Sequence, residues 1–254
     1  MVRRNWTREE LVLAFNLYCK TPFGKIHIRN PDVVELATLI GRTPSAVSWK
    51  LANFARLDPV LKQRNIVGAT HGGRAEVRIW EEFHNNWEEL SFESEQLLAN
   101  LKHLSIEKIV RIWPDDPAVE GKESEQLVRV RVNQNFFRQM VLASYGYRCC
   151  ITGLAVPELL NASHIVPWAI DIKNRLNPRN GVCLNALHDR AFDRGLITIT
   201  TDYEVKMSKK LKAPSNDASS FLLFKYNGIR IRPPDRFAPD VNFLIYHNEN
   251  VFLK

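Results

Sequence analysis

The chain has 254 residues, of which 45% are hydrophobic and 25% charged, and this composition excludes a disordered or low-complexity protein. No run of about 18 apolar residues occurs, which predicts no membrane span, and the polar, basic opening predicts no secretory signal. Lys and Arg outnumber Asp and Glu by 35 to 28, and the net charge of +7 favours an anionic partner such as nucleic acid.

The positive charge is unevenly distributed along the chain. Residues 127–254 carry 18 Lys and Arg against 10 Asp and Glu, whereas residues 91–126 carry 4 against 8. The four cysteines follow no disulfide spacing, and the adjacent Cys149 and Cys150 do not bridge easily. We therefore expect a reduced, cytoplasmic protein whose basic C-terminal part meets the anionic partner.

Residues 1–90 are expected to form a mainly helical, winged-helix-like DNA-binding domain. Thr7 is suited to cap a first helix, because its hydroxyl can accept a hydrogen bond from a backbone N–H of the first turn. Two further helices, separated by Gly41 and with Thr43 as the N-cap of the second, fit a helix-turn-helix. An ordinary helical hairpin is the alternative, because helix-turn-helix patterns are short.

The second helix of this pair carries polar side chains that can reach phosphates or base edges. The candidates on or near its exposed side are Ser45, Ser48, Trp49, Lys50 and Asn53. Two short strands, over 63–70 and 75–80, would flank a Gly72-Gly73 turn and make a wing with Arg74 near its tip.

A connector is expected between the first domain and a second one that covers residues 127–254. Residues 91–126 combine a short helix over 95–104 with an acidic stretch rich in Pro and Glu, which is typical of a linker. The second domain is expected to open with a strand over 127–133, where valines alternate with polar residues, and to continue with a helix over 135–145.

Three residues further along have an order that suits hydrolytic chemistry: His164, Asn180 and His188. A histidine with an ordinary pKa can take a proton from water near neutral pH, and a second imidazole can hold a divalent cation. An asparagine between them can fix the loop that carries the first histidine. Residues 161–166 and 181–184 are expected to be strands, and 187–192 a helix with His188 in its first turn.

These motifs resemble the HNH endonuclease family, most closely the branch of bacterial restriction-type enzymes. The resemblance runs over about residues 128–200, and the matching segments are Tyr147–Gly153, Ala162–Trp168, Asn177–Gly181 and Leu187–Gly195. It implies a ββα-metal fold that hydrolyses DNA phosphodiesters with one divalent ion. It further implies that His164 is the general base, that Asn180 orients the loop and that His188 binds the metal.

One position departs from the family pattern and affects the expected metal site. Many members carry Asp, Glu or His directly before the base, where this chain has Ser163, a weaker ligand. The expected ligands are therefore His188, Asp193 and Ser163, completed by water and DNA phosphates. For Asp193, a structural hydrogen bond or a pair with Arg190 or Arg194 is the alternative.

The expected cofactor is one divalent ion, magnesium or manganese, with nickel or cobalt as further options. Some relatives hold a structural zinc with two CxxC pairs, and because this chain has no CxxC we expect none. Candidate phosphate contacts in the nuclease part are Lys173, Arg175, Arg179, Arg190 and Arg194. Ordinary surface charge is the alternative for each, and Trp168 is a candidate either for stacking on DNA or for core packing.

The leading hypothesis is an α+β, two-domain restriction-type endonuclease that cuts double-stranded DNA as a homodimer, since one site per chain must serve two strands. A narrower hypothesis makes cleavage depend on 5-methylcytosine or 5-hydroxymethylcytosine, because a nuclease without a partner methylase must spare its own genome. Aromatic residues that could line a base pocket are Trp49, Phe54, Trp80 and Trp87. The alternative from another class is a DNA-binding regulator with a degenerate, inactive HNH domain, which Ser163 favours.

Overall fold

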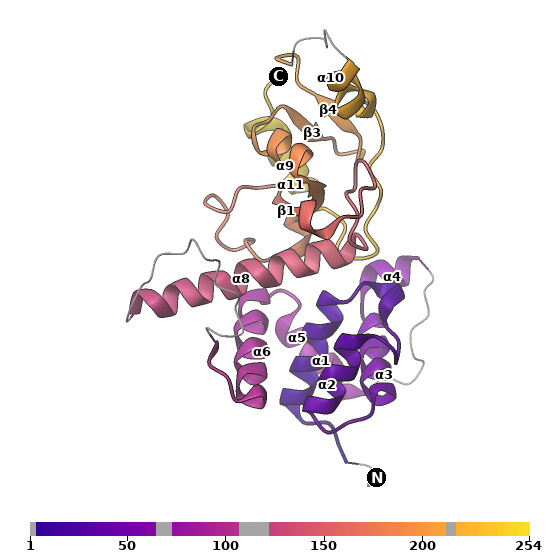
Figure 1. Cartoon of the computed structure of the whole chain (residues 1–254), viewed down its shortest axis with the longest axis vertical. Helices are drawn as coiled ribbons and strands as arrows, with labels where there is room; N and C mark the ends of the chain where they lie inside the picture. The colour runs from indigo at the N-terminus through magenta and orange to yellow at the C-terminus, as the bar shows by residue number, and fades with distance from the viewer. Residues whose placement is uncertain (1–3, 65–72, 107–121, 212–216) are drawn as a thin grey trace. The chain divides into compact units, whose positions relative to one another are not determined.

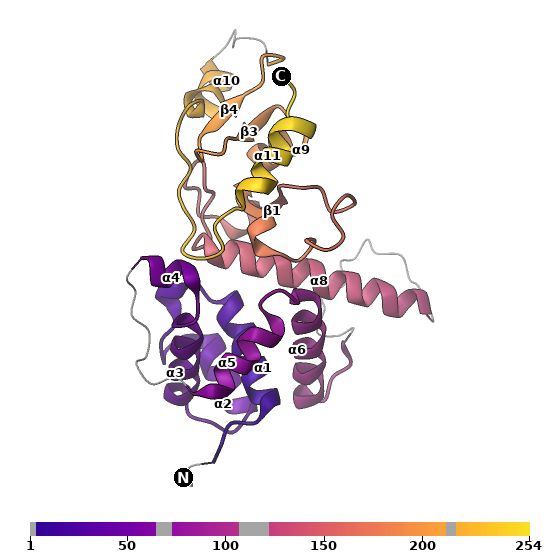
Figure 2. The same ribbon diagram turned by 180° about the vertical axis from the view of Figure 1, so that it is seen from behind.

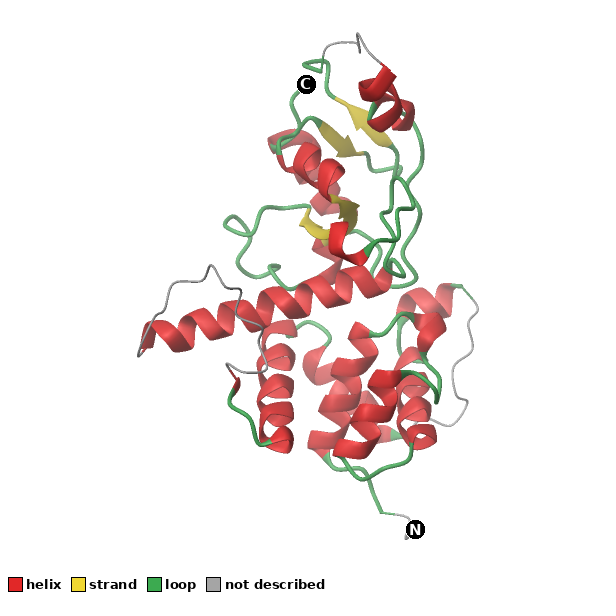
Figure 3. Ribbon diagram, viewed as in Figure 1, coloured by secondary structure: helices red, strands yellow, loops and turns green. Residues whose placement is uncertain are grey.

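The computed structural model of the chain divides into two compact units (Figure 1). The N-terminal unit spans Met1–Met140 and the C-terminal unit spans Val141–Lys254. Among the described residues, every strand belongs to the C-terminal unit, so the chain belongs to the expected α+β class (Figure 3). The structure describes residues 4–64, 73–106, 122–211 and 217–254.

The N-terminal unit is built around helix α1, which packs against four other helices, α2, α3, α5 and α6 (Figure 2). The aromatic core of this unit forms where Phe15 and Tyr18 of α1 meet Phe54 of α3. The elements are α1 (Arg8–Lys20), η1 (Phe23–Lys25), α2 (Pro31–Leu39), α3 (Pro44–Ala55), α4 (Pro59–Gln63), α5 (Arg74–Phe83), α6 (Trp87–Lys102) and α8 (Lys122–Ser144), whose last turn belongs to the C-terminal unit.

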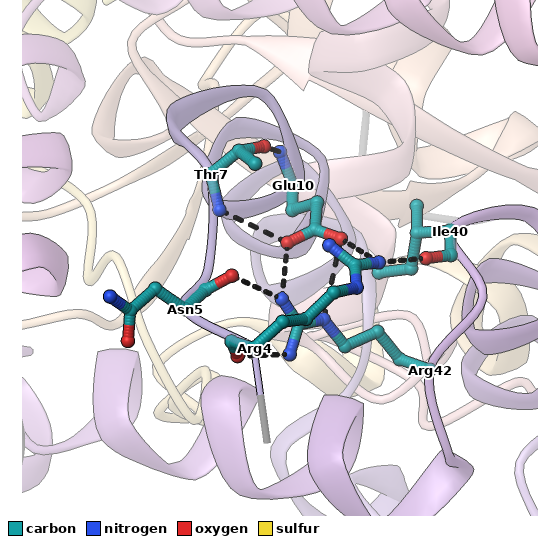
Figure 4. Close-up of polar contacts among 6 residues, drawn as sticks. All are labelled: Arg4, Asn5, Thr7, Glu10, Ile40 and Arg42. Carbon is teal, nitrogen blue, oxygen red and sulfur yellow. Dashed lines mark hydrogen bonds and ion pairs between the residues drawn. The ribbon is translucent and has the colours of Figure 1, made fainter. Parts of the chain in front are cut away.

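The start of α1 confirms the predicted cap and adds an ionic network to it. The Thr7 hydroxyl accepts from the Glu10 backbone N–H, and the Glu10 carboxylate accepts from the Thr7 N–H at 3.0 Å. The same carboxylate binds the guanidinium groups of Arg4 at 2.6 Å and Arg42 at 2.7 Å (Figure 4). Burial by itself would raise the pKa of Glu10, but hydrogen bonds from Arg42, Thr7 and Arg4 lower it below its ordinary value. The network fixes the α2–α3 turn to the start of α1.

The two helices expected to form a helix-turn-helix are present as α2 and α3. Gly41 ends the first with a φ of +64°, a conformation that suits glycine. Thr43 caps the second by accepting from the Ala46 N–H at 3.1 Å, and Pro44 occupies its first turn. The sequence therefore predicted the boundaries of this helix pair well.

The predicted wing is wrong in its second strand, because residues 75–80 lie within helix α5. The buried residues of α5 include Glu76, Ile79 and Phe83, and their spacing of three and four residues is that of one helical face. Of the first strand, expected over 63–70, Gln63 lies in α4, and residues 65–70 lie outside the described residues. Apolar and polar residues alternate at 75–80, which is compatible with a strand. The burial of one helical face shows that the segment folds as a helix instead.

The strand predicted over 127–133 is also wrong, because this segment belongs to α8. Val128, Val132 and Phe136 are buried at intervals of four residues, whereas Val130 is exposed. So short an alternation of valines is compatible both with a strand, whose side chains repeat every two residues, and with a helix, whose side chains repeat about every 3.6 residues. The burial of every fourth residue shows that this segment is helical. The expected helix at 95–104 is present but starts earlier, in α6, and most of the expected acidic linker lies outside the described residues.

The C-terminal unit contains two separate antiparallel hairpins, β1–β2 and β3–β4. Helix α9 packs against β1, β2 and β3, and helix α11 packs against β3. Asp240 caps α11 by accepting a hydrogen bond from the Asn242 N–H. The elements are η2 (Pro157–Leu159), β1 (Leu160–His164), η3 (Pro178–Asn180), β2 (Gly181–Asn185), α9 (Ala186–Asp193), β3 (Ile197–Ile199), β4 (Val205–Met207), α10 (Asp217–Leu222), η4 (Phe224–Tyr226) and α11 (Val241–Asn250).

The helices were also compared with the length and hydrophobicity that a bilayer crossing requires. Within the described ranges, none is both long and apolar enough to span a membrane.

Candidate functional site

The β1–β2 hairpin and helix α9 form the frame of the candidate site, in the predicted order of strand, loop, strand and helix. The strands pair with Ser163 opposite Val182 and His164 opposite Gly181. Helix α9 follows β2 directly because Asn185 ends the strand and caps the helix, accepting from the His188 N–H at 3.0 Å. The predicted hairpin and helix are therefore present within one or two residues of their expected bounds.

Asn180 holds the long loop of the hairpin closed at its base. Its side chain is buried, and its Oδ1 accepts from the Val166 N–H at 2.8 Å while its Nδ2 donates to the Val166 carbonyl at 3.2 Å. The Nδ2 also donates to the Asn174 carbonyl at 3.3 Å, and the Asn180 carbonyl accepts from Ile165 at 3.0 Å. The segment directly after His164 is thus fixed by both the backbone and the side chain of one residue.

His164 stands at the end of β1 with its ring oriented by the loop. Its Nε2 lies 2.9 Å from the Arg175 carbonyl oxygen, and its ring meets that of Trp168 edge-on at 5.3 Å. A carbonyl oxygen only accepts, so Nε2 carries the proton and Nδ1 carries the lone pair. Burial lowers the pKa of His164 below its ordinary value, and the Arg175 carbonyl offsets part of that effect. A neutral imidazole with a defined basic nitrogen suits proton abstraction from water.

Arg175 and Trp168 hold each other inside the loop. The Arg175 Nε donates to the Trp168 carbonyl at 2.9 Å, and its guanidinium carbon lies 5.2 Å from the centre of the Trp168 ring. Trp168 is half-buried between His164 and this guanidinium. The pair therefore supports the ring of His164, and each member keeps only part of its surface for a substrate.

Ser163 faces helix α9, where it meets an aspartate that sequence reasoning did not select. Its hydroxyl donates to Asp189 Oδ1, and Asn161, two residues earlier on the same face of β1, donates from Nδ2 to Asp189 Oδ2 at 2.6 Å. Both oxygens of this carboxylate are thus aimed at the strand that carries His164. The spacing of Asp189 and Asp193, four residues apart on a predicted helix, was the available signal.

Asp193 shares a face of α9 with Asp189, at the exposed end of the helix. Its pKa is raised, first by the loss of part of its hydration and then by the charge of Asp189, while Arg190 and Arg194 act in the opposite direction. Among the described residues no cation lies within ion-pair distance of either carboxylate. Two acidic side chains that repel each other beside a strand are an arrangement that a divalent cation would stabilise.

His188 lies on a different face of α9 from Asp193. An α-helix turns by about 100° per residue, which separates side chains five positions apart by roughly 140°. The His188 Nδ1 is 3.0 Å from Asn185 Oδ1, and its Nε2 is buried with no hydrogen-bond partner in the described structure. The ring meets Tyr226 edge-on at 5.3 Å, and burial together with the charge of Lys225 lowers its pKa to about 4. His188 is therefore a neutral, buried imidazole.

The expected ligands do not converge into a set rich in His and Asp. Within the described ranges, no group of three or more His, Cys, Asp or Glu side chains is placed to hold a metal ion. The side chains that the structure brings together are instead Asp189, Asp193, Ser163 and Asn161, two carboxylates with a hydroxyl and an amide. All four cysteines are buried thiols.

Comparison with known proteins addresses the same part of the chain. Residues 149–200 match the family model of the HNH endonucleases, and this range contains the hairpin, His164, Asn180 and all of α9. The C-terminal unit, which contains this matching segment, is called the HNH domain below. No match emerges among curated protein sequences.

The lysine and arginines expected to contact DNA in the HNH domain differ in whether their side chains already bind other residues. Lys173, Arg190 and Arg194 are exposed. Arg179 is exposed too, but it forms an ion pair with Asp240 at 3.0 Å, while Arg175 is held against Trp168. The exposed lysine and arginines are therefore the more available partners for phosphates.

In the N-terminal unit, the side chains of two residues expected to contact DNA bind Glu76 in this structure. The Lys50 ammonium pairs with the Glu76 carboxylate, and Asn53 Nδ2 donates to the same oxygen at 2.8 Å. Asn53 is only 3% exposed, and Glu76 is completely buried. This contact was not predicted, because residues 75–80 were assigned to a wing strand. Ser45 and Arg74 are exposed as expected, and Ser48 is half-buried.

The expected aromatic base pocket is also corrected by the structure. Phe54 and Trp80 pack against Phe15, and Trp87 lies near the same ring, so Phe54 and Trp87 belong to the core and the half-buried Trp80 lies against it. Trp49 alone of the four points to solvent, with 64% of its surface exposed. The surface of α3 therefore presents one tryptophan beside small residues.

Proposed function

We propose that the chain is a metal-dependent endodeoxyribonuclease that uses His164 as the general base. The observation that carries the proposal is the fixed tautomer of His164. Its Nε2 lies 2.9 Å from the Arg175 carbonyl, which orients the imidazole with Nε2 as the donor and Nδ1 as the basic nitrogen, and Asn180 fixes the segment that follows. The match of this segment to HNH endonucleases supports the same reaction.

For the metal, we propose Asp189 and Asp193 as ligands, with Ser163 close by. The ligand set expected from the sequence contained His188, Asp193 and Ser163, but His188 and Asp193 occupy different faces of α9, whereas Asp189 and Asp193 share one. Two carboxylates suit magnesium or manganese, which prefer oxygen ligands. A bound divalent ion would supply stabilisation of the charge that develops on the leaving 3′ oxygen. His188, with an unpaired Nε2, is the alternative ligand and would suit nickel or cobalt better.

In the N-terminal unit, we propose that α2 and α3 act as a DNA-binding helix-turn-helix without the wing strand at 75–80. Ser45, Ser48 and Trp49 would face DNA, with Arg74 as a phosphate contact. We further propose a restriction role against duplex DNA in the cytoplasm, as a homodimer so that each copy cuts one strand. Dependence of cleavage on 5-methylcytosine or 5-hydroxymethylcytosine stays a hypothesis. Of the four aromatic residues considered for a base pocket, Trp49 is the one that is exposed and could contact a modified base.

The binding-only alternative is a DNA-binding regulator with an inactive HNH domain. It was favoured by Ser163, which is a poor metal ligand. The Ser163 hydroxyl donates to Asp189, however, so an adjacent carboxylate can take over the role that the strand residue lacks. This contact makes a working nuclease the better supported function.

The test is cleavage of matched plasmids carrying cytosine, 5-methylcytosine or 5-hydroxymethylcytosine, with magnesium or manganese. We expect cleavage by the wild type and a loss of at least about 100-fold in His164→Ala, because a positioned base contributes about that much. His27→Ala, a change to an exposed histidine of the N-terminal unit, is the matched control and should cut normally. Cleavage of modified plasmids alone would support modification dependence.

The ligand assignment is tested in the same assay with two further variants. Asp189→Asn should abolish both cleavage and manganese binding measured by calorimetry, whereas His188→Ala should keep manganese binding if its fold is intact. The reverse pattern would assign the metal to His188. An absence of cleavage by the wild type on every plasmid and with every metal would overturn the nuclease proposal.

A further inference from the structure

The long loop of the β1–β2 hairpin exposes two large apolar side chains. Ile170 is 60% exposed and Ile172 is 68% exposed, the highest value among the exposed large apolar residues of the described chain. Figure 3 shows this loop as a broad arc that leaves the small sheet and returns to it. Two isoleucines in solvent are unfavourable for an isolated domain, so their position needs a reason.

The loop around them is held in one shape by hydrogen bonds. Asp171, between the two isoleucines, accepts from the Asn174 N–H at 3.1 Å and from its Nδ2 at 2.7 Å. Asn174 Oδ1 accepts from Asn177 Nδ2 at 3.0 Å, and the Asn174 carbonyl accepts from Asn180. Because the side chain of Asp171 is used in this network, Ile170 and Ile172 are presented outward by an ordered turn.

A cation follows this apolar pair directly. Lys173 is next to Ile172 and exposed, while Arg179, exposed at the end of the same loop, pairs with Asp240 at 3.0 Å. The loop's one acidic residue, Asp171, is bound to Asn174. Positive charge around an apolar tip is complementary to nucleic acid, where phosphates border a groove whose floor is made of base edges.

The loop that carries the pair also holds the ring of His164. The Arg175 carbonyl accepts from its Nε2, and Trp168 contacts it edge-on. Both contacts come from residues within two to five positions of the isoleucines. An element that engages DNA through Ile170 and Ile172 would therefore act on the duplex next to the proposed catalytic base.

We propose that Ile170 and Ile172 form an apolar wedge that inserts between base steps of duplex DNA beside the phosphate to be cut. Proteins that bind the minor groove use exposed isoleucine, leucine or phenylalanine in this way, and they unstack the step and bend the duplex. Lys173, directly after Ile172, would hold a neighbouring phosphate. The inference rests on the proposed nuclease function, and it adds the mode of substrate engagement.

The test uses the full chain with the changes Ile170→Ser and Ile172→Ser, and duplex DNA that contains 2-aminopurine, whose fluorescence rises when it unstacks. Binding is measured in a His164→Ala background by polarisation, so that cleavage does not interfere. The matched control is Ile229→Ser with Val241→Ser, which changes two other exposed apolar residues of the same unit. Thermal melting checks that each variant is folded.

We expect the His164→Ala protein and the control to raise 2-aminopurine fluorescence, and the double serine variant to lose that rise. In the background with His164 intact, the double serine variant should cut duplex at least tenfold more slowly. An unchanged fluorescence rise in that variant would overturn the wedge. The wedge would also be overturned if the double serine variant lost dimerisation in light scattering while it kept its DNA binding. The isoleucine pair would then contact a second copy of the chain. Hydrolysis of bis(p-nitrophenyl) phosphate by the wild type tests the nuclease function separately.

Discussion

In the N-terminal unit, the buried glutamates Glu10, Glu76 and Glu95 each meet a cation, whereas the acidic pair of the HNH domain does not in the described structure. Glu10 binds Arg4 and Arg42, and Glu95 binds Lys20 at 2.5 Å. These contacts connect helices distant in sequence, for example α1 with the turn after α2. The charges of the N-terminal unit therefore act mainly to hold its helices together.

The HNH domain keeps its acidic pair beside a strand of polar residues instead. Asp189 accepts from Asn161 and Ser163, and the charge of Asp189 raises the pKa of Asp193. In the described part of this domain neither carboxylate has an ion-pair partner. The comparison teaches that buried carboxylates paired with cations connect helices, whereas two carboxylates without a cation partner among the described residues, on the helix packed against the strand that carries His164, are candidates for a functional site.

This difference between the units is tested most strongly by replacing one carboxylate with the corresponding amide in each unit. Asp193→Asn should reduce cleavage by about 100-fold, because it removes a proposed metal ligand, and should change the free energy of unfolding by less than about 0.5 kcal/mol. Glu76→Gln should lower the free energy of unfolding by about 3 kcal/mol, because it leaves Lys50 without its buried partner. Urea unfolding and plasmid cleavage measure the two effects.

The control for this pair is Glu35→Gln, which removes an exposed partner of Lys102 and should alter stability by less than about 1 kcal/mol. If Asp193→Asn unfolded the HNH domain while Glu76→Gln left the N-terminal unit intact, the assignment of roles to the two units would be reversed.

A second prediction concerns acid, which should weaken the HNH domain before the N-terminal unit. Burial lowers the pKa of both His188 and His247 to about 4, so these side chains stay neutral in the folded domain while they gain protons when unfolded below pH 6.5. Stability is therefore complete above pH 6.5 and is lost as pH falls toward 4, by up to about 3 kcal/mol for each histidine.

The carboxylates of the N-terminal unit also lose their stabilising contribution as pH falls, but only at lower pH than the histidines. The pKa values of Glu10 and Glu76 are lowered below 4.5, despite burial, by hydrogen bonds from cations and amides, so their contribution persists to lower pH. Hydrogen exchange at pH 7 and pH 5, corrected for intrinsic rates, should show protection falling in the HNH domain first. An equal loss in both units would contradict this account.

The smallest expected effect separates DNA binding from stability within the N-terminal unit. Trp49→Ala should weaken duplex binding by about tenfold, the size of a lost aromatic stacking contact, and should leave the melting temperature nearly unchanged because the side chain is exposed. Fluorescence polarisation with labelled duplex measures the affinity. Ile28→Ala, also exposed, is the control, and equal binding by Trp49→Ala would remove α3 from the proposed interface.

The accuracy of the sequence analysis followed the strength of local signals. Thr7, Gly41 and Thr43 defined helix boundaries correctly, because caps and left-handed glycines act on the neighbouring backbone alone. The hairpin that carries His164 and Asn180 was predicted for a similar reason, because residues typical of strands, turns and helix caps follow one another in that segment. The strands expected at 75–80 and 127–133 failed because a few alternating apolar residues fit both a strand and a helix.

His247 illustrates what local patterns cannot reveal. It had no visible partner in the sequence, yet its Nδ1 lies 2.8 Å from Thr198 Oγ1, its Nε2 lies 3.3 Å from the Phe192 carbonyl, and its ring stacks on Phe192. It thereby connects α11 and β3 to the end of α9 that carries Asp193. Contacts of this kind join residues about 50 positions apart, and no periodicity records them.

The sequence by itself determined the HNH segment, its ordered His, Asn and His residues and the helix pair of the N-terminal unit, because these depend on residue identity at short spacing. Only the tertiary structure decided that Asp189 faces Ser163, that His188 turns to another face of α9, and that Glu76 occupies Lys50 and Asn53. The physical reason is that the direction of a side chain depends on helical phase and on the element packed against it.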